Sequence, residues 1–194
     1  IYFLGSRIGK FNSDGSPNAI PGSNIPLSAA GVLILWLGWF GFNGGSVLSA
    51  DPELTSLTLV TTCLAASAGG VSSALMSNLL YKNFDLTMFM NGVLGGLVGI
   101  TAGADQMGPT SAVLIGAIAG VILVFGISLL DKLKLDDPVG AIPVHLICGI
   151  WGTLAVGIFW EMASVEQFIN QLIGVGIIGA FSCITAIIIV FIVK

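Results

Sequence analysis

Long runs without a charged residue, separated by short polar segments, are the main pattern of this chain. Six such runs follow a polar stretch that ends near residue 25. Each is close to or longer than the ~20 residues that a helix rising ~1.5 Å per residue needs to cross a ~30 Å hydrocarbon core. The pattern therefore predicts six membrane-spanning helices, at about residues 26–50, 54–81, 86–104, 106–130, 138–160 and 167–193. The run at residues 86–104 is the shortest, and its glycines predict close contact with a neighbouring helix.

The first eight residues, IYFLGSRI, are predicted to form the end of a further apolar helix whose beginning the sequence does not contain. The chain starts with Ile1 rather than Met, and it shows no signal-peptide pattern. Residues 12–24 are rich in Ser, Gly, Pro and Asn, which predicts an irregular connection. We therefore expect an all-α, multi-pass membrane protein with six membrane helices and the end of a seventh, present here as a piece of a longer chain.

Composition agrees with a membrane location and excludes several functions. Of the 194 residues, 55% are hydrophobic and 8% are charged, and the mean hydropathy is +1.02, far too apolar for a soluble domain. Six basic residues scattered over this length cannot form a nucleic-acid-binding surface. The three cysteines all lie inside apolar runs without CxxC spacing, so they suggest neither a zinc site nor a disulfide framework. We expect no metal and no cofactor.

The charges between the predicted helices fall into two groups. Basic residues occupy alternate connections: Arg7 and Lys10, then Lys82, then Lys132 and Lys134, then Lys194. The intervening connections contain only acids: Asp51 and Glu53, then Asp105, then Glu161 and Glu166. Because basic loops stay in the cytoplasm, this alternation supports six crossings and predicts that the basic connections and the C-terminus are cytoplasmic.

The only histidine, His145, lies inside an uncharged run. If residues 138–160 span the bilayer, His145 lies roughly 12 Å from the nearer boundary, where an ionisable group predicts a functional site. The alternative is a packing residue whose ring N–H bonds a carbonyl on a neighbouring helix. Cys148, Gly149 and Gly152 are predicted to share its helix face, and Pro143 removes one helical hydrogen bond. Such a face suits either a narrow polar path or a close helix contact.

A second group of candidate residues lies in the first complete helix. Trp39, Phe42 and Ser46 are spaced at i, i+3 and i+7, which places them on one face. These aromatics also fit an interfacial belt without any further role. If the helix runs outward, Ser46 lies at the outer mouth, Phe42 about a turn below it, and His145 below both. One route through all three requires the two helices to be neighbours.

Two motifs, WFGFNGGS at residues 39–46 and DDPVGAIPVHLICGIWG at residues 136–152, resemble those of the ammonium transporter family, called Amt or Mep and related to the Rhesus proteins. The resemblance covers nearly the whole chain and matches the second half of such a protein, from the end of the fifth membrane helix to the eleventh. It implies homotrimers of eleven-helix subunits, each with its own pore between two inverted five-helix repeats. Ammonium or ammonia would be the substrate, with methylammonium as an analogue. A PII-type regulator would dock on a tail that is absent after Lys194.

The resemblance also implies roles for the candidate residues. Phe42 would be one of two stacked phenylalanines that gate the outer end of the pore, and Ser46 would help to bind ammonium in the outer vestibule. Trp39 would match a pore-helix tryptophan, and His145 would be the second of two hydrogen-bonded pore histidines. Aromatic rings attract a small cation, and a narrow apolar lumen favours loss of its proton before crossing. A neutral imidazole can then accept or relay that proton.

The chain departs from the family pattern at several points. The first pore histidine, the partner phenylalanine and the outer-site tryptophan belong to the first five helices, which this chain lacks. Leu146 replaces a usual glycine and Pro143 a usual small residue, so we expect the lumen beside His145 to be narrower or shifted. For this chain alone we predict no selective conduction.

Two other classes of function compete with transport. The first is a non-conducting ammonium-sensing or structural membrane subunit with the same fold. The second is an intramembrane enzyme acting through His145, which the sequence disfavours. A single histidine without an interior Asp, Glu or second His cannot form a metal site or a catalytic triad.

Overall fold

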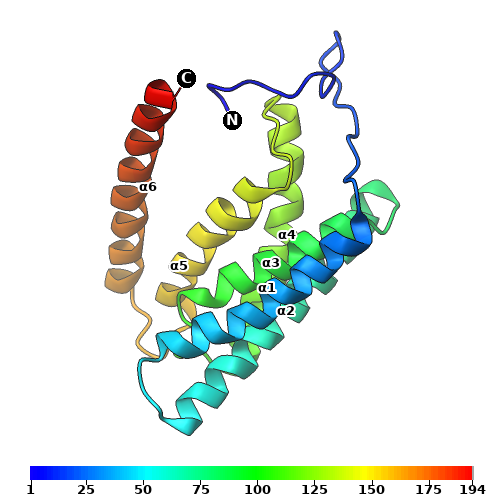
Figure 1. Ribbon diagram of the computed structural model, residues 1–194. Coiled ribbons are helices and arrows are strands. Elements are labelled where there is room, and N and C mark those ends of the chain that lie inside the picture. The colour runs from blue at the N-terminus through cyan, green and yellow to red at the C-terminus, as the bar shows by residue number, and fades with distance from the viewer. Residues whose placement is uncertain (194) are drawn as a thin grey trace.

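The computed structural model describes residues 1–193, which form a bundle of antiparallel helices (Figure 1). Within this range the structure contains no strand, only an isolated bridge between Phe11 and Pro17. The helices are α1 (Ile25–Ser46), α2 (Pro52–Tyr81), α3 (Leu86–Thr101), α4 (Pro109–Lys132), the π-helix η1 (Ile142–Ile147), which continues into α5 (Cys148–Phe159), and α6 (Val165–Val193).

Local sequence signals explain where several helices begin. The side chains of Asn24, Asp51 and Asp85 cap α1, α2 and α3 by accepting hydrogen bonds from backbone N–H groups of the first turn. A proline occupies the first turn of α1, α2 and α4, where its missing N–H has no intrahelical partner in any case. Asp137 accepts three backbone N–H groups ahead of and at the start of η1. The chain therefore enters each of these helices in a defined direction.

Several helix ends differ from the sequence-based boundaries. The first helix ends at Ser46 rather than near residue 50, and α4 begins at Pro109 because residues 102–107 form turns after α3. The last run begins to be helical at Val165. Five helical segments are long and apolar enough to cross a membrane, with η1 and α5 counted as one, whereas α3 is a shorter apolar helix. The six predicted runs thus correspond to six helical segments within the described residues.

Residues 1–8, predicted to be the end of a helix, form a single turn in which the N–H groups of Leu4 and Gly5 donate to the carbonyl of Ile1. The helix end itself stays a prediction. Gly5 then has φ +78°, a left-handed conformation that ends the turn. A segment this short does not hold a helix without neighbouring turns. Instead it is anchored by side chains: Arg7 pairs with Asp136, Lys10 with Asp131, and the ring of Phe3 lies 5.4 Å from that of Phe191.

The core lies where α2, α3 and α4 cross. Gly69 and Gly92 face each other across α2 and α3, and Gly96 and Gly116 both lie directly against the backbone of Ala65. A Cβ at any of these glycines would overlap backbone atoms of the neighbouring helix. The close contact predicted from the glycines of residues 86–104 is therefore confirmed, and it is what allows three helices to pack without large side chains between them.

The two outer helices are attached much more loosely. Among the described residues, Asn43 is the only buried side chain of α1, and α6 has none. Figure 1 shows α6 standing beside α5, and within residues 1–193 it packs against no other helix. Most apolar side chains of both helices are exposed, so large apolar faces of this chain remain uncovered.

Alternation of helix direction gathers the connections at two ends of the bundle (Figure 1). One end carries the five basic residues among those described: Arg7, Lys10, Lys82, Lys132 and Lys134. The other end carries the acids of the α1–α2, α3–α4 and α5–α6 connections. Lys194, the sixth basic residue, lies outside the described residues. We call the first the basic end, because it holds all the described basic residues, although it also holds Asp14, Asp85, Asp131, Asp136 and Asp137. We call the second, whose charged residues are all acids, the acidic end.

Candidate functional site

His145 lies in the middle of η1, a π-helix with wider turns than an α-helix. Such short π segments are frequent at functional sites. Pro143, which has no backbone N–H to donate, stands within it, and the N–H of Cys148 donates to the carbonyls of Pro143 and His145. His145 and Leu146 are both exposed, whereas Pro143 and Val144 are buried. One side of η1 therefore packs into the protein and the other presents the imidazole.

Two of the small residues predicted to share a helix face with His145, namely Cys148 and Gly152, pack into contacts with other helices. Cys148 is fully buried and its thiol donates to the carbonyl of Ala119 in α4 at 3.5 Å. Gly152 lies against the backbone of Gly99 in α3. The i+3 and i+7 relations assume 3.6 residues per turn, and the π-helix breaks that spacing. Cys148 and Gly152 thus serve the close helix contact, while His145 lies on the uncovered side.

Pro143 and Leu146, the two residues that depart from the family pattern, lie on different sides of η1. Pro143 is buried, and its ring lies beside Gly126 of α4. Its bulk packs against α4, whereas Leu146 is 55% exposed and adjoins His145 on the uncovered side. The expectation that these two residues narrow or shift the lumen beside His145 stays a prediction.

The candidates in α1 form one small cluster. The rings of Trp39 and Phe42 meet edge to face with their centroids 6.1 Å apart. Trp39 Nε1 donates to Thr101 Oγ1 at 2.8 Å, and Ser46 Oγ donates to the backbone carbonyl of Phe42 at 2.8 Å. Phe42 is 60% exposed, and Ser46 is also exposed. Two of the three side chains therefore face the uncovered side of α1.

The cluster of α1 and His145 are not in direct contact, because α3 separates their helices. Among the described residues α1 makes no contact with η1 or α5, whereas α3 contacts all three. Thr101 of α3 binds Trp39, and Gly99 of α3 receives Gly152 of α5. Residues two apart on a helix point to nearly opposite sides, so α3 supports both groups from its two faces. A single route was expected to need these two helices as neighbours. In the structure they are not in contact, and α3 lies between them.

The sequence analysis did not single out Asn43. It is 3% exposed, and its Nδ2 donates to Thr62 Oγ1 of α2 at 3.0 Å. A carboxamide in the middle of a membrane-length apolar run was a visible signal, because such a group needs a partner there.

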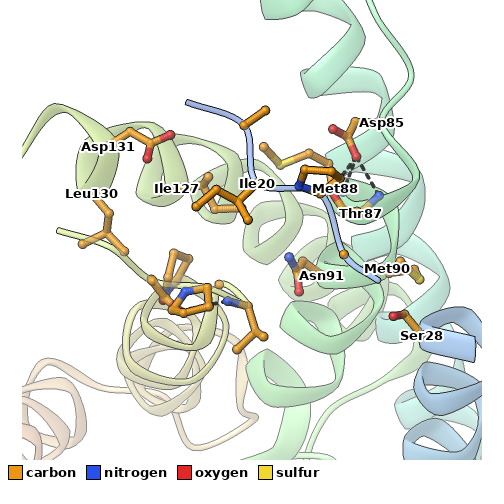
Figure 2. Close-up of a pocket in the computed structure, with 18 of the residues that line it drawn as sticks. Ile20, Ser28, Asp85, Thr87, Met88, Met90, Asn91, Ile127, Leu130 and Asp131 are labelled. Carbon is orange, nitrogen blue, oxygen red and sulfur yellow. Dashed lines mark hydrogen bonds between the residues drawn. The ribbon is translucent and has the colours of Figure 1, made fainter. Parts of the chain in front are cut away.

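A cavity of about 680 Å³ lies at the basic end (Figure 2). Figure 2 shows Asn91 of α3 on one side and Ile127, Leu130 and Asp131 of α4 on the other. Its carboxylates already have structural partners: Asp85 caps α3, Asp137 binds the backbone at the start of η1, and Asp131 pairs with Lys10. The cavity reaches Pro143, but His145 is not among its lining residues.

One ion pair fixes the basic end of η1. The side chain of Asp136 is 2% exposed and accepts from Nε and a terminal nitrogen of Arg7, at 2.7 and 2.8 Å, and from the Arg7 backbone at 2.9 Å. Hydrogen bonding from Arg7 lowers the pKa of Asp136 to about 2 and raises the pKa of Arg7. Among the described residues, no three His, Cys, Asp or Glu side chains come together as metal ligands.

Antiparallel apolar helices, uncovered apolar faces and a histidine in an interrupted helix define a multi-pass membrane protein with an all-helical fold. The sequence model of the Ammonium Transporter Family matches residues 1–194, so the chain belongs to this family. Ammonium transporter Amt2 of Archaeoglobus fulgidus is 48% identical over 159 residues, which cover 82% of this chain and 34% of that protein. Ammonium transporter 1 member 3 of Solanum lycopersicum is 40% identical over 179 residues, covering 86% of this chain and 39% of that protein.

Solved structures agree with this assignment. A protein described as a sensor Amt protein superimposes with a TM-score of 0.86 at 38% identity, covering 91% of this chain. Mep2 of Candida albicans superimposes with a TM-score of 0.87 at 25% identity, covering 96% of this chain. In both cases the match spans 45% of the other chain. The predicted family and fold class are confirmed, and the chain spans less than half the length of these relatives.

Proposed function

We propose that this chain is the second half of a membrane protein that transports ammonium or ammonia through a narrow hydrophobic pore. The observation that carries the proposal is the sidedness of α1 and η1. Phe42 and His145 are exposed, whereas their neighbours Asn43, Pro143 and Val144 are buried. Because the chain matches 45% of its structural relatives, the uncovered sides are where the rest of the pore wall packs.

Transport proceeds in this proposal from the acidic end to the basic end. Ser46 and the face of Phe42 attract the cation at the outer mouth through dipole and cation–π contacts. The apolar passage beyond Phe42 disfavours the charged species, so ammonium gives up a proton before it crosses. His145 lies further along, where a neutral imidazole offers a hydrogen bond and accepts or relays the proton.

The proposal extends to orientation and assembly. The basic end faces the cytoplasm, because positively charged connections are retained there. The complete protein is a homotrimer in the plasma or inner membrane, and its remaining uncovered apolar faces contact lipid or other subunits. A PII-type regulator binds a cytoplasmic tail that follows this chain.

A second function is favoured by two observations. A similar structure is described as a sensor Amt protein, and Leu146 stands beside His145 on the uncovered side, where it occupies space that a permeant would need. In this alternative the complete protein binds ammonium at its outer mouth and passes on a signal without conducting.

Methylammonium uptake by the complete protein separates these functions. We expect uptake by the native protein, and His145→Ala is expected to lower the rate or change its dependence on pH. Cys183→Ala, an exposed site on α6, is the matched control and should leave uptake unchanged. Unchanged rate and pH dependence in His145→Ala would remove His145 from the mechanism. Ammonium binding without any uptake by the native protein would support the sensor.

A further inference from the structure

α1 is attached to the rest of the chain by two polar side-chain bonds. Trp39 Nε1 donates to Thr101 of α3 at 2.8 Å, and Asn43 Nδ2 donates to Thr62 of α2 at 3.0 Å. Within residues 1–193 no other side-chain hydrogen bond joins α1 to another helix. Asn43 is its only buried residue in this range, and Val32, Trp36 and Trp39 add apolar packing against α2 and α3. The two hydrogen bonds are the directional contacts that orient α1.

The two bonds lie on either side of Phe42 in the sequence. Trp39 precedes Phe42 by three residues and holds its ring edge to face, and Asn43 follows it directly. One bond leads to α3 and the other to α2, which pack tightly against each other. A helix held at two neighbouring points against two different helices cannot rotate about its own axis. The direction in which Phe42 points is therefore set by this pair.

Stability alone does not explain these residue types. Asn43 Oδ1 is buried and, among the described residues, has no hydrogen-bond partner, which is unfavourable relative to a satisfied or apolar group. The hydroxyl groups of Thr62 and Thr101 already donate to carbonyls of their own helices, at 2.6 and 2.7 Å. They thus present oriented lone pairs to α1. These two hydrogen bonds therefore orient α1 but do not give it the greatest possible stability.

We propose that Trp39 and Asn43 are positioning residues that hold the ring of Phe42 over the transport pathway. Neither needs to touch the permeant. The inference rests on the proposed function, because it takes Phe42 to lie on that pathway. It assigns Trp39 a role through its indole N–H, and it adds Asn43, Thr62 and Thr101 to the residues on which the outer gate depends.

The test compares two tryptophans on the same helix in the complete protein. Trp39→Phe keeps an aromatic ring next to Phe42 but removes the N–H donor. Trp36→Phe is the matched control, because Trp36 Nε1 is buried without a partner. Loss of one hydrogen bond of about 1 kcal/mol corresponds to roughly a fivefold effect. We expect the KM for methylammonium uptake to change about fivefold in Trp39→Phe and to stay unchanged in Trp36→Phe.

Variants on the acceptor side exclude a simple folding defect. Thr101→Val and Thr62→Val keep the side-chain shape, and Asn43→Leu replaces the amide by an apolar group of similar size. Each should retain the melting temperature within a few degrees and still alter uptake. In a double-mutant cycle, Trp39→Phe combined with Thr101→Val should be no worse than the stronger single variant, because both remove the same bond.

A readout at Phe42 itself distinguishes this inference from the proposed function. With 4-fluorophenylalanine at position 42, ¹⁹F NMR should give one narrow resonance in the native protein and in Trp36→Phe. Trp39→Phe and Asn43→Leu should broaden or split it. Spectra and uptake identical to the Trp36→Phe control would overturn the inference. Phe42→Ala judges the proposed function separately: unchanged uptake there would exclude Phe42 as a gate, whatever the spectra show.

Discussion

The centre and the periphery of this molecule are held together in different ways. Where α2, α3 and α4 cross, glycines let backbones touch, and an added Cβ would overlap atoms of the neighbouring helix. At the periphery, α1 is held by partly buried side chains and two polar bonds, and α6 packs against α5 and, through Phe191, against Phe3. The difference indicates a rigid support with two outer helices whose uncovered sides belong to contacts that this chain alone does not make.

The largest effect is expected when a large side chain replaces a glycine where α2, α3 and α4 cross. Gly96 lies against the backbone of Ala65, which cannot move aside as a flexible side chain would. Overpacking of this kind costs several kcal/mol, since typical values of about 1–3 kcal/mol assume that neighbours can adjust. We expect Gly96→Leu to yield almost no monodisperse protein in detergent. Gly31→Leu on α1, where nothing lies within 4 Å of the added Cβ, should be recovered normally. Equal recovery of the two variants would contradict the rigid centre.

A smaller effect is expected from removing one hydroxyl in each region, a buried one at the centre and one on α6 that is not buried. Thr61 is fully buried and donates to the carbonyl of Ala104 at 2.6 Å, joining α2 to the end of α3. Thr61→Val should lower the free energy of unfolding by about 0.5–1.5 kcal/mol, the usual range for such bonds in membrane proteins. Thr185→Val on α6 removes a hydroxyl that bonds only carbonyls of its own helix and should have no measurable effect. Thermal unfolding in detergent measures both, and a larger loss for Thr185→Val would reverse the comparison.

The smallest effect concerns the ion pair that joins the N-terminal segment to η1. Because Arg7 holds the pKa of Asp136 at about 2, below the ordinary 3.8, the ionised carboxylate stabilises the folded state above pH of about 4. That contribution is lost as the pH falls from about 4 towards 2. Asp136→Asn should therefore be less stable than the native protein at neutral pH, and the difference should shrink below pH of about 4. Unfolding temperatures measured between neutral pH and pH 3 test this, and a constant difference would show that the charge of Asp136 is not responsible.

Much of the fold could be predicted from the sequence because each membrane helix needs a long apolar run and each turn a polar one. The runs at residues 54–81 and 167–193 coincide with α2 and α6 to within two residues. The glycines of residues 86–104 correctly predicted close packing, since only residues without a side chain permit it. The helix end at residues 1–8 stays a prediction, because the structure shows only a single turn there and a helix needs neighbouring turns.

The site was less accessible from the sequence. The predicted face of His145 assumed an α-helix, and no pattern announced the π-helix that separates it from Cys148 and Gly152. Asn43 was overlooked because the partner of a buried amide depends on which helix lies opposite. Only the fold reveals that this partner is Thr62 of α2. The assignment of Trp39, Phe42, Ser46 and His145 to a pathway stays a prediction, since the facing half of the pore wall is outside this chain.

The most direct test is an experimental structure of the complete protein, in which the first half covers α1 and η1. The account predicts that the side chains of Phe42 and His145 line one continuous narrow passage, with α3 behind both. Either side chain directed into lipid, or a closed helix contact between them that leaves no passage, would contradict it.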